Sequence, residues 1–184
     1  MTTKQTYKTG LGTSDADSIT LLGHDLATEI LGKYSFGELS YYLITKRRPT
    51  PGQLVMFEAV LASLADHGFT PTAIAARLTY ASAPDSLQGA LAAGLLGGGS
   101  RFLGVTEDCA HFLARELKEI GAAPTTQDGW DAAALNAVQK QKDIGKFVPG
   151  LGHPVHKQGD PRTPVLMAMA REQGLFGSHL SLFE

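Results

Sequence analysis

Cysteine is nearly absent from this sequence, which limits how the chain can be stabilised. Cys109 is the only cysteine among 184 residues, so no disulfide framework is available. A chain of this kind is typical of a reducing compartment, and we expect Cys109 to act as a small buried apolar residue. The N-terminal stretch 1–18 is polar and lacks the apolar segment of a signal peptide, so a cytoplasmic location is predicted.

Long apolar runs and clusters of one charge are also missing. The most apolar run, residues 90–96, is too short to cross a bilayer, and its alanines and glycines favour close packing between helices. The net charge is -2, and no stretch forms a basic stripe. With 43% hydrophobic and 18% charged residues, the chain has a globular composition, and we expect neither a nucleic acid nor a membrane as partner.

Strand patterns are missing too, because valine and isoleucine form no alternating run between turns. Apolar residues recur instead at helical spacing. The clearest helix begins at Thr50 and Pro51 and runs into Gly68. Other helices are expected to begin at Thr70 and Pro71, near Asp85, at Thr106, near Trp130, at Thr163 and Pro164, and at Ser178. The sequence therefore predicts an all-α fold.

One of these helices carries a clear core pattern. It is expected to begin at Thr106, with acidic residues in its first turn that suit the helix dipole, and to end at Gly121. Its buried face is predicted to contain Phe112, Leu113, Leu117 and Ile120.

The segment 146–159 breaks the helical pattern, and the stretch 147–162 concentrates residues that suit chemistry. Gly150 and Gly152 allow the backbone to approach a ligand closely, and His153 can transfer protons near neutral pH. Lys157 and Arg162 can bind phosphate and carboxylate groups, so the set suits an anionic substrate. On composition alone, an ordinary surface loop with turn glycines and solvated histidines explains the segment equally well.

Two other features were weighed for function. His67 lies at the expected end of the helix that begins near Pro51, where a histidine more often interacts with the last carbonyl groups of the helix. His153 and His156 form too small a set for a metal ion, since neither a cysteine nor a third histidine lies nearby and structural zinc takes four ligands. No metal is therefore predicted.

Two segments resemble the active-site segments of the citrate synthase superfamily. Ala65-Asp66-His67 is similar to the superfamily's Asp-His segment, and residues 148–153 with 160–162 are similar to its Gly-x-Gly-His through Asp-Pro-Arg segment. Residues 76–96 resemble the stand-alone citryl-CoA lyases and the lyase module of ATP-citrate lyase. Citrate synthases typically carry Leu-His-Gly-Gly after this helix, where residues 96–104 read Leu-Gly-Gly-Gly-Ser-Arg-Phe-Leu-Gly. The resemblance therefore favours the lyase branch.

The resemblance implies a citrate synthase-like helical fold and a homodimer. Residues of about 1–104 would form part of the large helical domain, and about 105–184 a small-domain-like region with the coenzyme A loop. Family members continue into an Asn-Val-Asp-like segment whose aspartate completes the catalytic set, whereas this sequence stops at Glu184. We expect a C-terminally truncated chain that is a weak or inactive lyase by itself, since losing a general acid or base costs about 10²- to 10⁴-fold in rate.

The implied reaction is the cleavage of citryl-CoA to acetyl-CoA and oxaloacetate by a reversed Claisen condensation. By resemblance, His67 would stabilise the enolate oxygen that forms when the carbon–carbon bond breaks. His153 would act on the oxygen that changes between hydroxyl and ketone, either relaying its proton or polarising the carbonyl group, and Arg162 would bind a substrate carboxylate.

The resemblance also implies how the coenzyme A thioester is held as a substrate, with no covalently bound cofactor. The backbone at Val148, Gly150, Leu151 and Gly152 would face the adenine end, and Lys157 would meet a phosphate group. A citrate or methylcitrate synthase that runs the condensation forward shares these groups and stays an alternative. A non-catalytic helical scaffold is the alternative from another class.

Overall fold

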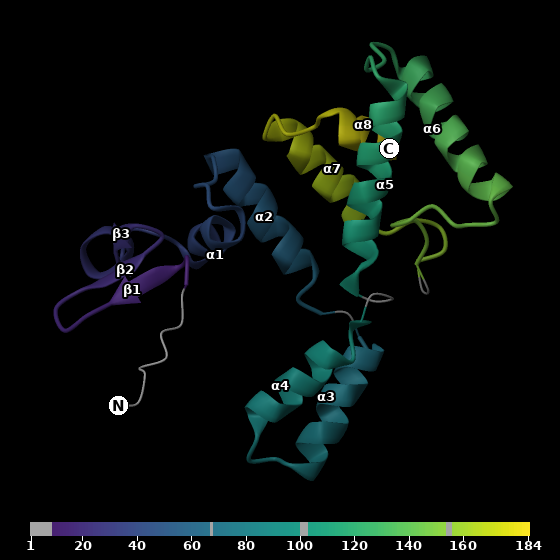
Figure 1. Ribbon diagram of the computed structural model, residues 1–184. Helices are drawn as coiled ribbons and strands as arrows, with labels where there is room; N and C mark the ends of the chain where they lie inside the picture. Colours follow the sequence, from purple (N-terminus) through teal and green to yellow (C-terminus); the bar gives the residue numbers. More distant parts are fainter. Residues whose placement is uncertain (1–8, 67, 100–102, 154–155) are drawn as a thin grey trace, which may run out of the picture. The chain divides into compact units, whose positions relative to one another are not determined.

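The computed structural model describes residues 9–66, 68–99, 103–153 and 156–184. The chain divides into two compact units, Met1–Ala62 and Ser63–Glu184, whose elements are shown in Figure 1. The predicted division near residue 104 concerns the domains of the family and stays a prediction.

A small antiparallel sheet opens the first unit. Its strands are β1 (Gly12–Ser14), β2 (Ile19–Leu21) and β3 (His24–Asp25), in the order β1-β2-β3. Thr13 pairs with Thr20 across β1 and β2, and Leu22 and Gly23 turn the chain into β3 with positive φ angles. This sheet was not predicted, because strands of two or three residues are too short to show an alternating pattern.

Two α-helices follow the sheet after the short π-helix η1 (Leu26–Ile30). Helix α1 (Phe36–Thr45) was not predicted, although Ser35 caps it by accepting a hydrogen bond from the Glu38 amide at 3.1 Å. Helix α2 (Pro51–Ser63) begins as predicted, and Thr50 and Gln53 form a reciprocal capping box. It ends at Ser63, so the prediction that it runs into Gly68 was wrong.

Helices α3 (Pro71–Ser82) and α4 (Leu87–Leu96) form a hairpin in the second unit, shown in teal in Figure 1. Small residues allow the two helices to approach closely, with Gly94 against Ala76 and Gly97 against Ala75. Both helices lie where the sequence predicts them. Ala90 is the one residue of this pair that is buried.

The main core lies between the helices that follow. They are α5 (Val105–Ile120), α6 (Gln127–Asp143), α7 (Arg162–Glu172) and α8 (Ser178–Phe183). A buried cluster of Phe112, Leu113, Ala137 and Leu182 joins α5, α6 and α8. Leu117, Ile120 and Trp130 pack against this cluster, so the predicted buried face of α5 is confirmed.

The helix starts differ from the predictions by a few residues. Helix α5 begins at Val105, one residue before its predicted cap Thr106. Helix α6 begins at Gln127 because the Thr126 hydroxyl accepts a hydrogen bond from the Gly129 amide, and the sequence analysis missed this cap. Most of the described elements are helices, so the predicted helical fold class is confirmed. None of the described helices is long and apolar enough to cross a membrane.

Candidate functional site

The loop between α6 and α7 begins with a defined helix stop. Gly145, with a φ of 67°, donates a hydrogen bond to the Lys142 carbonyl at 2.9 Å, and Lys146 donates to the Gln141 carbonyl at 2.9 Å. Such a left-handed glycine satisfies the last carbonyl groups of a helix. As a result, Lys142 and Lys146 lie at the start of the loop.

The next turn of the loop rests on α5. Leu151 donates a hydrogen bond to the Val148 carbonyl at 3.3 Å, and Val148 packs against the main core. Gly150 has a φ of 83°, and a Cβ atom there would lie 2.7 Å from Cys109 Sγ. Glycine is thus required at residue 150 both for its backbone angle and for the contact with α5. Burial raises the pKa of the Cys109 thiol, which favours the neutral form.

A cleft of about 250 Å³ lies beside this turn. Val148, Leu151 and Gly152 line it together with Lys142 and Lys146. These two lysines were not predicted as site residues, because basic residues in and just after the last turn of a helix are common for electrostatic reasons. The structure therefore adds two cationic groups to the predicted coenzyme A loop.

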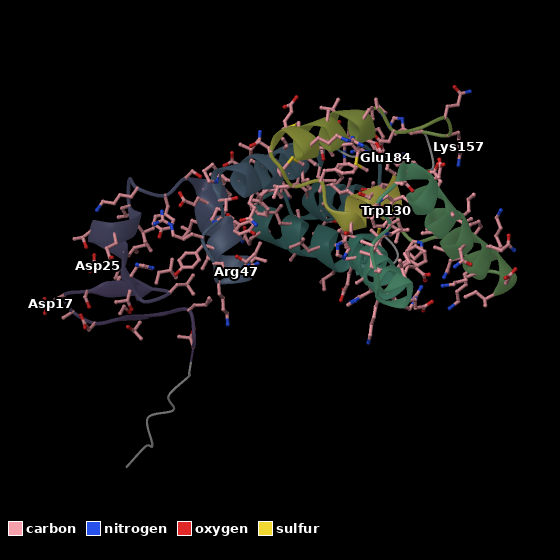
Figure 2. The ribbon with its side chains drawn as sticks, turned by 90° about the horizontal axis from the view of Figure 1, so that it is seen from above. Asp17, Asp25, Arg47, Trp130, Lys157 and Glu184 are labelled. Carbon is pink, nitrogen blue, oxygen red and sulfur yellow. The ribbon has the colours of Figure 1, made fainter. Side chains whose placement is uncertain are left out.

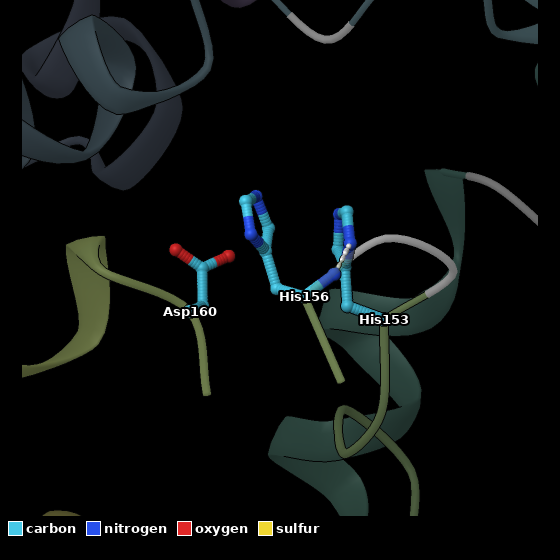
Figure 3. Close-up of side chains that lie close together, drawn as sticks. All are labelled: His153, His156 and Asp160. Atoms are coloured by element: carbon cyan, nitrogen blue, oxygen red, sulfur yellow. Dashed lines mark hydrogen bonds between the residues drawn. The ribbon is translucent and has the colours of Figure 1, made fainter. Parts of the chain in front are cut away.

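A hydrogen bond within the loop fixes which ring nitrogen of His153 acts as an acceptor. Its Nδ1 accepts a hydrogen bond from the His156 amide at 3.1 Å, drawn as a dashed line in Figure 3. An Nδ1 that accepts places the proton of the neutral ring on Nε2, and this Nε2 is buried. The two imidazole rings lie with their centroids 4.6 Å apart.

Asp160 and Arg162 form a two-pronged ion pair at the start of α7. Arg162 Nε donates to Asp160 Oδ1 at 2.9 Å, and Nη2 donates to Oδ2 at 2.5 Å. The Arg162 amide also donates to Asp160 Oδ1, which explains why α7 begins at Arg162 and not at the predicted Thr163. These bonds from the Arg162 side chain and backbone, with a smaller contribution from His156, hold the pKa of Asp160 well below its usual range.

Arg162 also connects the loop to the end of α2. Its Nη1 donates to the Ser63 carbonyl at 2.9 Å, a contact between residues 99 positions apart in the sequence. Three of its five N–H donors are thus used within the described part of the chain, which leaves two for a ligand. Asp66, just beyond Ser63, accepts a hydrogen bond from the Gly68 amide at 3.0 Å.

The structure describes all of the predicted site residues except one. His67 lies outside the described residues, so its predicted meeting with His153 stays a prediction. His153 and Arg162 belong to one loop region, where Val148, Gly150, Leu151 and Gly152 form the adjoining turn. Lys157 is exposed on the same loop and is labelled in Figure 2.

One grouping in the loop was not anticipated. His153, His156 and Asp160 each offer a possible metal-ligand atom, and these three atoms lie within 4.8 Å of one another (Figure 3). The prediction of no metal counted cysteines and histidines alone. A carboxylate four residues after His156 is the signal that could have completed the set.

A second cleft, of about 300 Å³, lies in the first unit. Asp15, Asp17 and Asp25 contribute to its lining, and none of the predicted site residues does. Its acidic lining disfavours an anionic ligand such as coenzyme A.

The comparison with protein families identifies the class of the chain. Residues 11–183 match the family described as citrate synthase, C-terminal domain. This match covers nearly all of the sequence, so the chain belongs to the citrate synthase family. A comparison with curated protein sequences gives no match.

Solved structures agree with the predicted resemblance to citryl-CoA lyases. The chain is similar to citryl-CoA lyase from Hydrogenobacter thermophilus, with 31% identity, a TM-score of 0.81, and coverage of 97% of this chain and 65% of that chain. It is also similar to ATP citrate lyase from Methanothrix soehngenii, in complex with citrate and coenzyme A, with 25% identity, a TM-score of 0.73, and coverage of 94% and 26%. ATP citrate lyase from Methanosaeta concilii, in complex with (3S)-citryl-CoA, shares the fold at 24% identity, with a TM-score of 0.74 and coverage of 99% and 29%.

Proposed function

We propose that this chain provides the coenzyme A loop and catalytic histidines of a citryl-CoA lyase, which cleaves citryl-CoA to acetyl-CoA and oxaloacetate. The observation that carries the proposal is the hydrogen bond from the His156 amide to Nδ1 of His153, in a loop that also presents Arg162. The similarity to citryl-CoA lyase and to a coenzyme A complex of ATP citrate lyase supports the same substrate class.

The chemistry of the cleavage assigns a role to the Nε2 proton of His153. The citryl hydroxyl gives its proton to water, the carbon–carbon bond breaks as the ketone forms, and the bonding electrons move to the thioester as an enolate. The enolate carbon later takes up one proton, so the reaction overall moves one proton from the hydroxyl to the methyl group. Because Nδ1 of His153 already accepts a hydrogen bond, Nε2–H is the group that can donate to the reacting oxygen. The geometry therefore favours polarisation over proton relay, and one such donor is worth about 3 kcal/mol in the transition state.

The enolate requires its own partner. By family resemblance, His67 would donate a hydrogen bond to the enolate oxygen, which then collapses to acetyl-CoA by taking a proton at carbon. The Arg162 contact to the Ser63 carbonyl supports this role indirectly, because it connects the loop to a residue four positions before His67.

Arg162 is suited to the carboxylates of citryl-CoA. Its two remaining N–H donors can bind one carboxylate in addition to Asp160, while Asp160 holds the guanidinium in place. A substrate carboxylate thus enters beside an oriented arginine and does not need to organise it.

The cleft beside the turn fits the nucleotide end of coenzyme A. Val148 and Leu151 provide apolar surface for an adenine ring, and Lys142 and Lys146 provide charge for phosphate groups. Lys157, exposed on the same loop, adds a third cation. The two lysines that line the cleft beside the glycine turn support coenzyme A over an uncharged acyl donor.

A homodimer is the proposed assembly, and the α3–α4 hairpin is its proposed interface. Leu91 and Leu95 of α4 remain 60% and 71% exposed, and Leu78 of α3 remains 66% exposed. Burying a leucine stabilises an interface by about 1.5–3 kcal/mol, so a second copy of the hairpin would gain substantially from covering them.

Calorimetry with coenzyme A tests the proposed function first. The full chain is expected to bind coenzyme A, and Lys146→Gln should weaken the affinity several-fold, more strongly at low salt, because one phosphate contact is lost. His179→Gln, a substitution at an exposed position of α8, serves as the control and should leave the affinity unchanged. Absence of binding in the wild-type chain would favour the helical scaffold.

Turnover tests the reaction itself. The chain is incubated with citryl-CoA and, separately, with acetyl-CoA and oxaloacetate, and the products are quantified. Any cleavage should fall by about 100-fold or more in His153→Asn, which removes the ring that donates from Nε2. A chain that forms citryl-CoA or citrate but never cleaves citryl-CoA would instead be assigned to the synthases.

A further inference from the structure

The geometry points to a binding site for a divalent transition-metal ion of the zinc class, formed by His153, His156 and Asp160. Each side chain offers one ligand atom, and the three atoms lie within 4.8 Å of one another. Two imidazoles and one carboxylate are ligands that zinc and its neighbours in the periodic table prefer. A three-ligand set leaves a fourth position open for water or a substrate oxygen.

The spacing of the ligands is close to what a metal requires. Ligand atoms at about 2.0–2.2 Å from a tetrahedral ion are about 3.4 Å apart, so a contraction of roughly 1 Å completes the site. The three residues lie on a loop, and Gly159, with a φ of 116°, lies between His156 and Asp160. Small torsional changes in the side chains and in this loop supply the contraction without disturbing a helix.

Arg162 has two opposite effects on ion binding at these ligands. Arg162 holds both oxygens of Asp160 through Nε and Nη2 and so orients the carboxylate. The positive charge of Arg162 opposes a second cation, which limits the affinity. The carboxylate keeps lone pairs beyond the Arg162 bonds, so the arginine and an ion can share it.

Ion binding and the proposed catalysis require different states of His153. Coordination through Nε2 replaces the proton that the lyase mechanism uses, and coordination through Nδ1 displaces the His156 amide. An ion on these ligands would therefore switch the loop off, a regulatory consequence that rests on the proposed function. The ion site itself does not rest on it.

Titration of the tag-free full chain with Co²⁺, followed by visible absorption, tests the site directly. Saturable binding of one ion per chain is expected, with Zn²⁺ displacing Co²⁺. His156→Asn and Asp160→Asn should each weaken binding by at least about 10-fold, the smaller of the losses seen when the surroundings of a metal site are altered. His179→Asn is the matched control and should bind as the wild type does.

Two results would overturn the ion site. One is the absence of saturable Co²⁺ binding in the wild-type chain, and the other is unchanged affinity in both ligand variants. Circular dichroism of each variant shows whether it is folded, and the use of two separate ligand variants keeps the test decisive if one of them unfolds.

Turnover in the presence of Zn²⁺ tests the regulatory consequence. Citryl-CoA cleavage by the wild type should fall at least 10-fold at saturating Zn²⁺ and recover on chelation. His156→Asn keeps the backbone amide that bonds His153, so its cleavage should resist Zn²⁺. Unchanged turnover in zinc-saturated wild type would refute the switch, whereas a chain that binds Co²⁺ but neither binds coenzyme A nor cleaves citryl-CoA would refute the proposed function and leave the ion site standing.

Discussion

Helices α4 and α5 use their apolar residues in opposite ways. Helix α4 consists mostly of leucine, alanine and glycine, yet Ala90 is its one buried residue in the described structure. Helix α5 is rich in charged residues, yet it buries Phe112 and Leu113 because α6 and α8 contribute to the same cluster. The difference teaches that apolar content alone does not determine burial. The leucines of α4 stay exposed because no element of the described structure covers them.

The largest expected effect comes from truncating a buried side chain of α5. Phe112 is 5% exposed at the centre of the core, so Phe112→Ala should lower the free energy of unfolding by about 3–5 kcal/mol. Leu78→Ala on the exposed face of α3 should change it by less than about 0.5 kcal/mol in the monomer. Urea denaturation followed by circular dichroism measures the free energy of unfolding of both variants. Equal losses of stability would contradict the claim that α5 is packed in the core while this face of α3 is exposed.

The second prediction tests whether the exposed leucines of α4 form the proposed dimer interface. Leu91→Glu combined with Leu95→Glu should raise the dissociation constant of the proposed dimer by about 100-fold or more, because burying two unpaired carboxylates is costly. Leu135→Glu, at an exposed position of α6, is the control. Sedimentation at micromolar concentration measures the assembly. A monomeric wild-type chain would show that the hairpin serves another purpose.

The elements that the sequence predicts well are those whose signals are local. Pro51 and Pro71 mark the starts of α2 and α3, and the i, i+4, i+7 spacing of Leu113, Leu117 and Ile120 marks the face of α5. Helix α1 was missed although its signals are also local, since Ser35 caps it and Glu38 lies in its first turn. The sheet was missed because its strands are stabilised by turns and not by an alternating pattern.

The sequence predicts which loop carries the candidate site, but it does not predict the hydrogen bonds within that loop. The glycines, His153 and Arg162 stand out by residue type and by family resemblance. The bond from the His156 amide to His153 and the bond from Arg162 to Ser63 depend on the path of the folded chain, so no spacing rule could predict them. Lys142 and Lys146 were missed for the same reason, since the end of α6 turns them toward the cleft.

The third prediction concerns how the core supports the loop. Gly150→Ala introduces both backbone strain and a Cβ atom against Cys109, whereas Gly152→Ala introduces strain alone because nothing lies within 4 Å of its Cβ position in the described structure. Gly150→Ala should therefore be more destabilising than Gly152→Ala by about 1–3 kcal/mol. Thermal or urea unfolding of the two variants measures the difference. Equal losses would mean that the loop does not depend on its contact with α5.

The smallest expected effect concerns pH. Asp160 has a folded-state pKa below its unfolded value, so its ion pair with Arg162 stabilises the chain above about pH 4 and loses this contribution as the pH falls. The melting temperature of the wild type should exceed that of Asp160→Asn near neutral pH, and the difference should shrink between about pH 5 and pH 2. Asp131→Asn, on the exposed surface of α6, is the control. A difference that is constant with pH would contradict the assignment.

The nitrogen NMR spectrum of the imidazole rings, recorded with and without citryl-CoA, is the most direct test of the account. The signals of His153 are assigned by their loss in His153→Asn. We expect a neutral ring with an unprotonated Nδ1 and a protonated Nε2. The chemical shift of Nε2 should change when citryl-CoA is added. Two results would contradict the claim that this loop acts on a coenzyme A substrate. One is a ring protonated at Nδ1, and the other is a set of His153 nitrogen signals whose chemical shifts do not change when citryl-CoA is added.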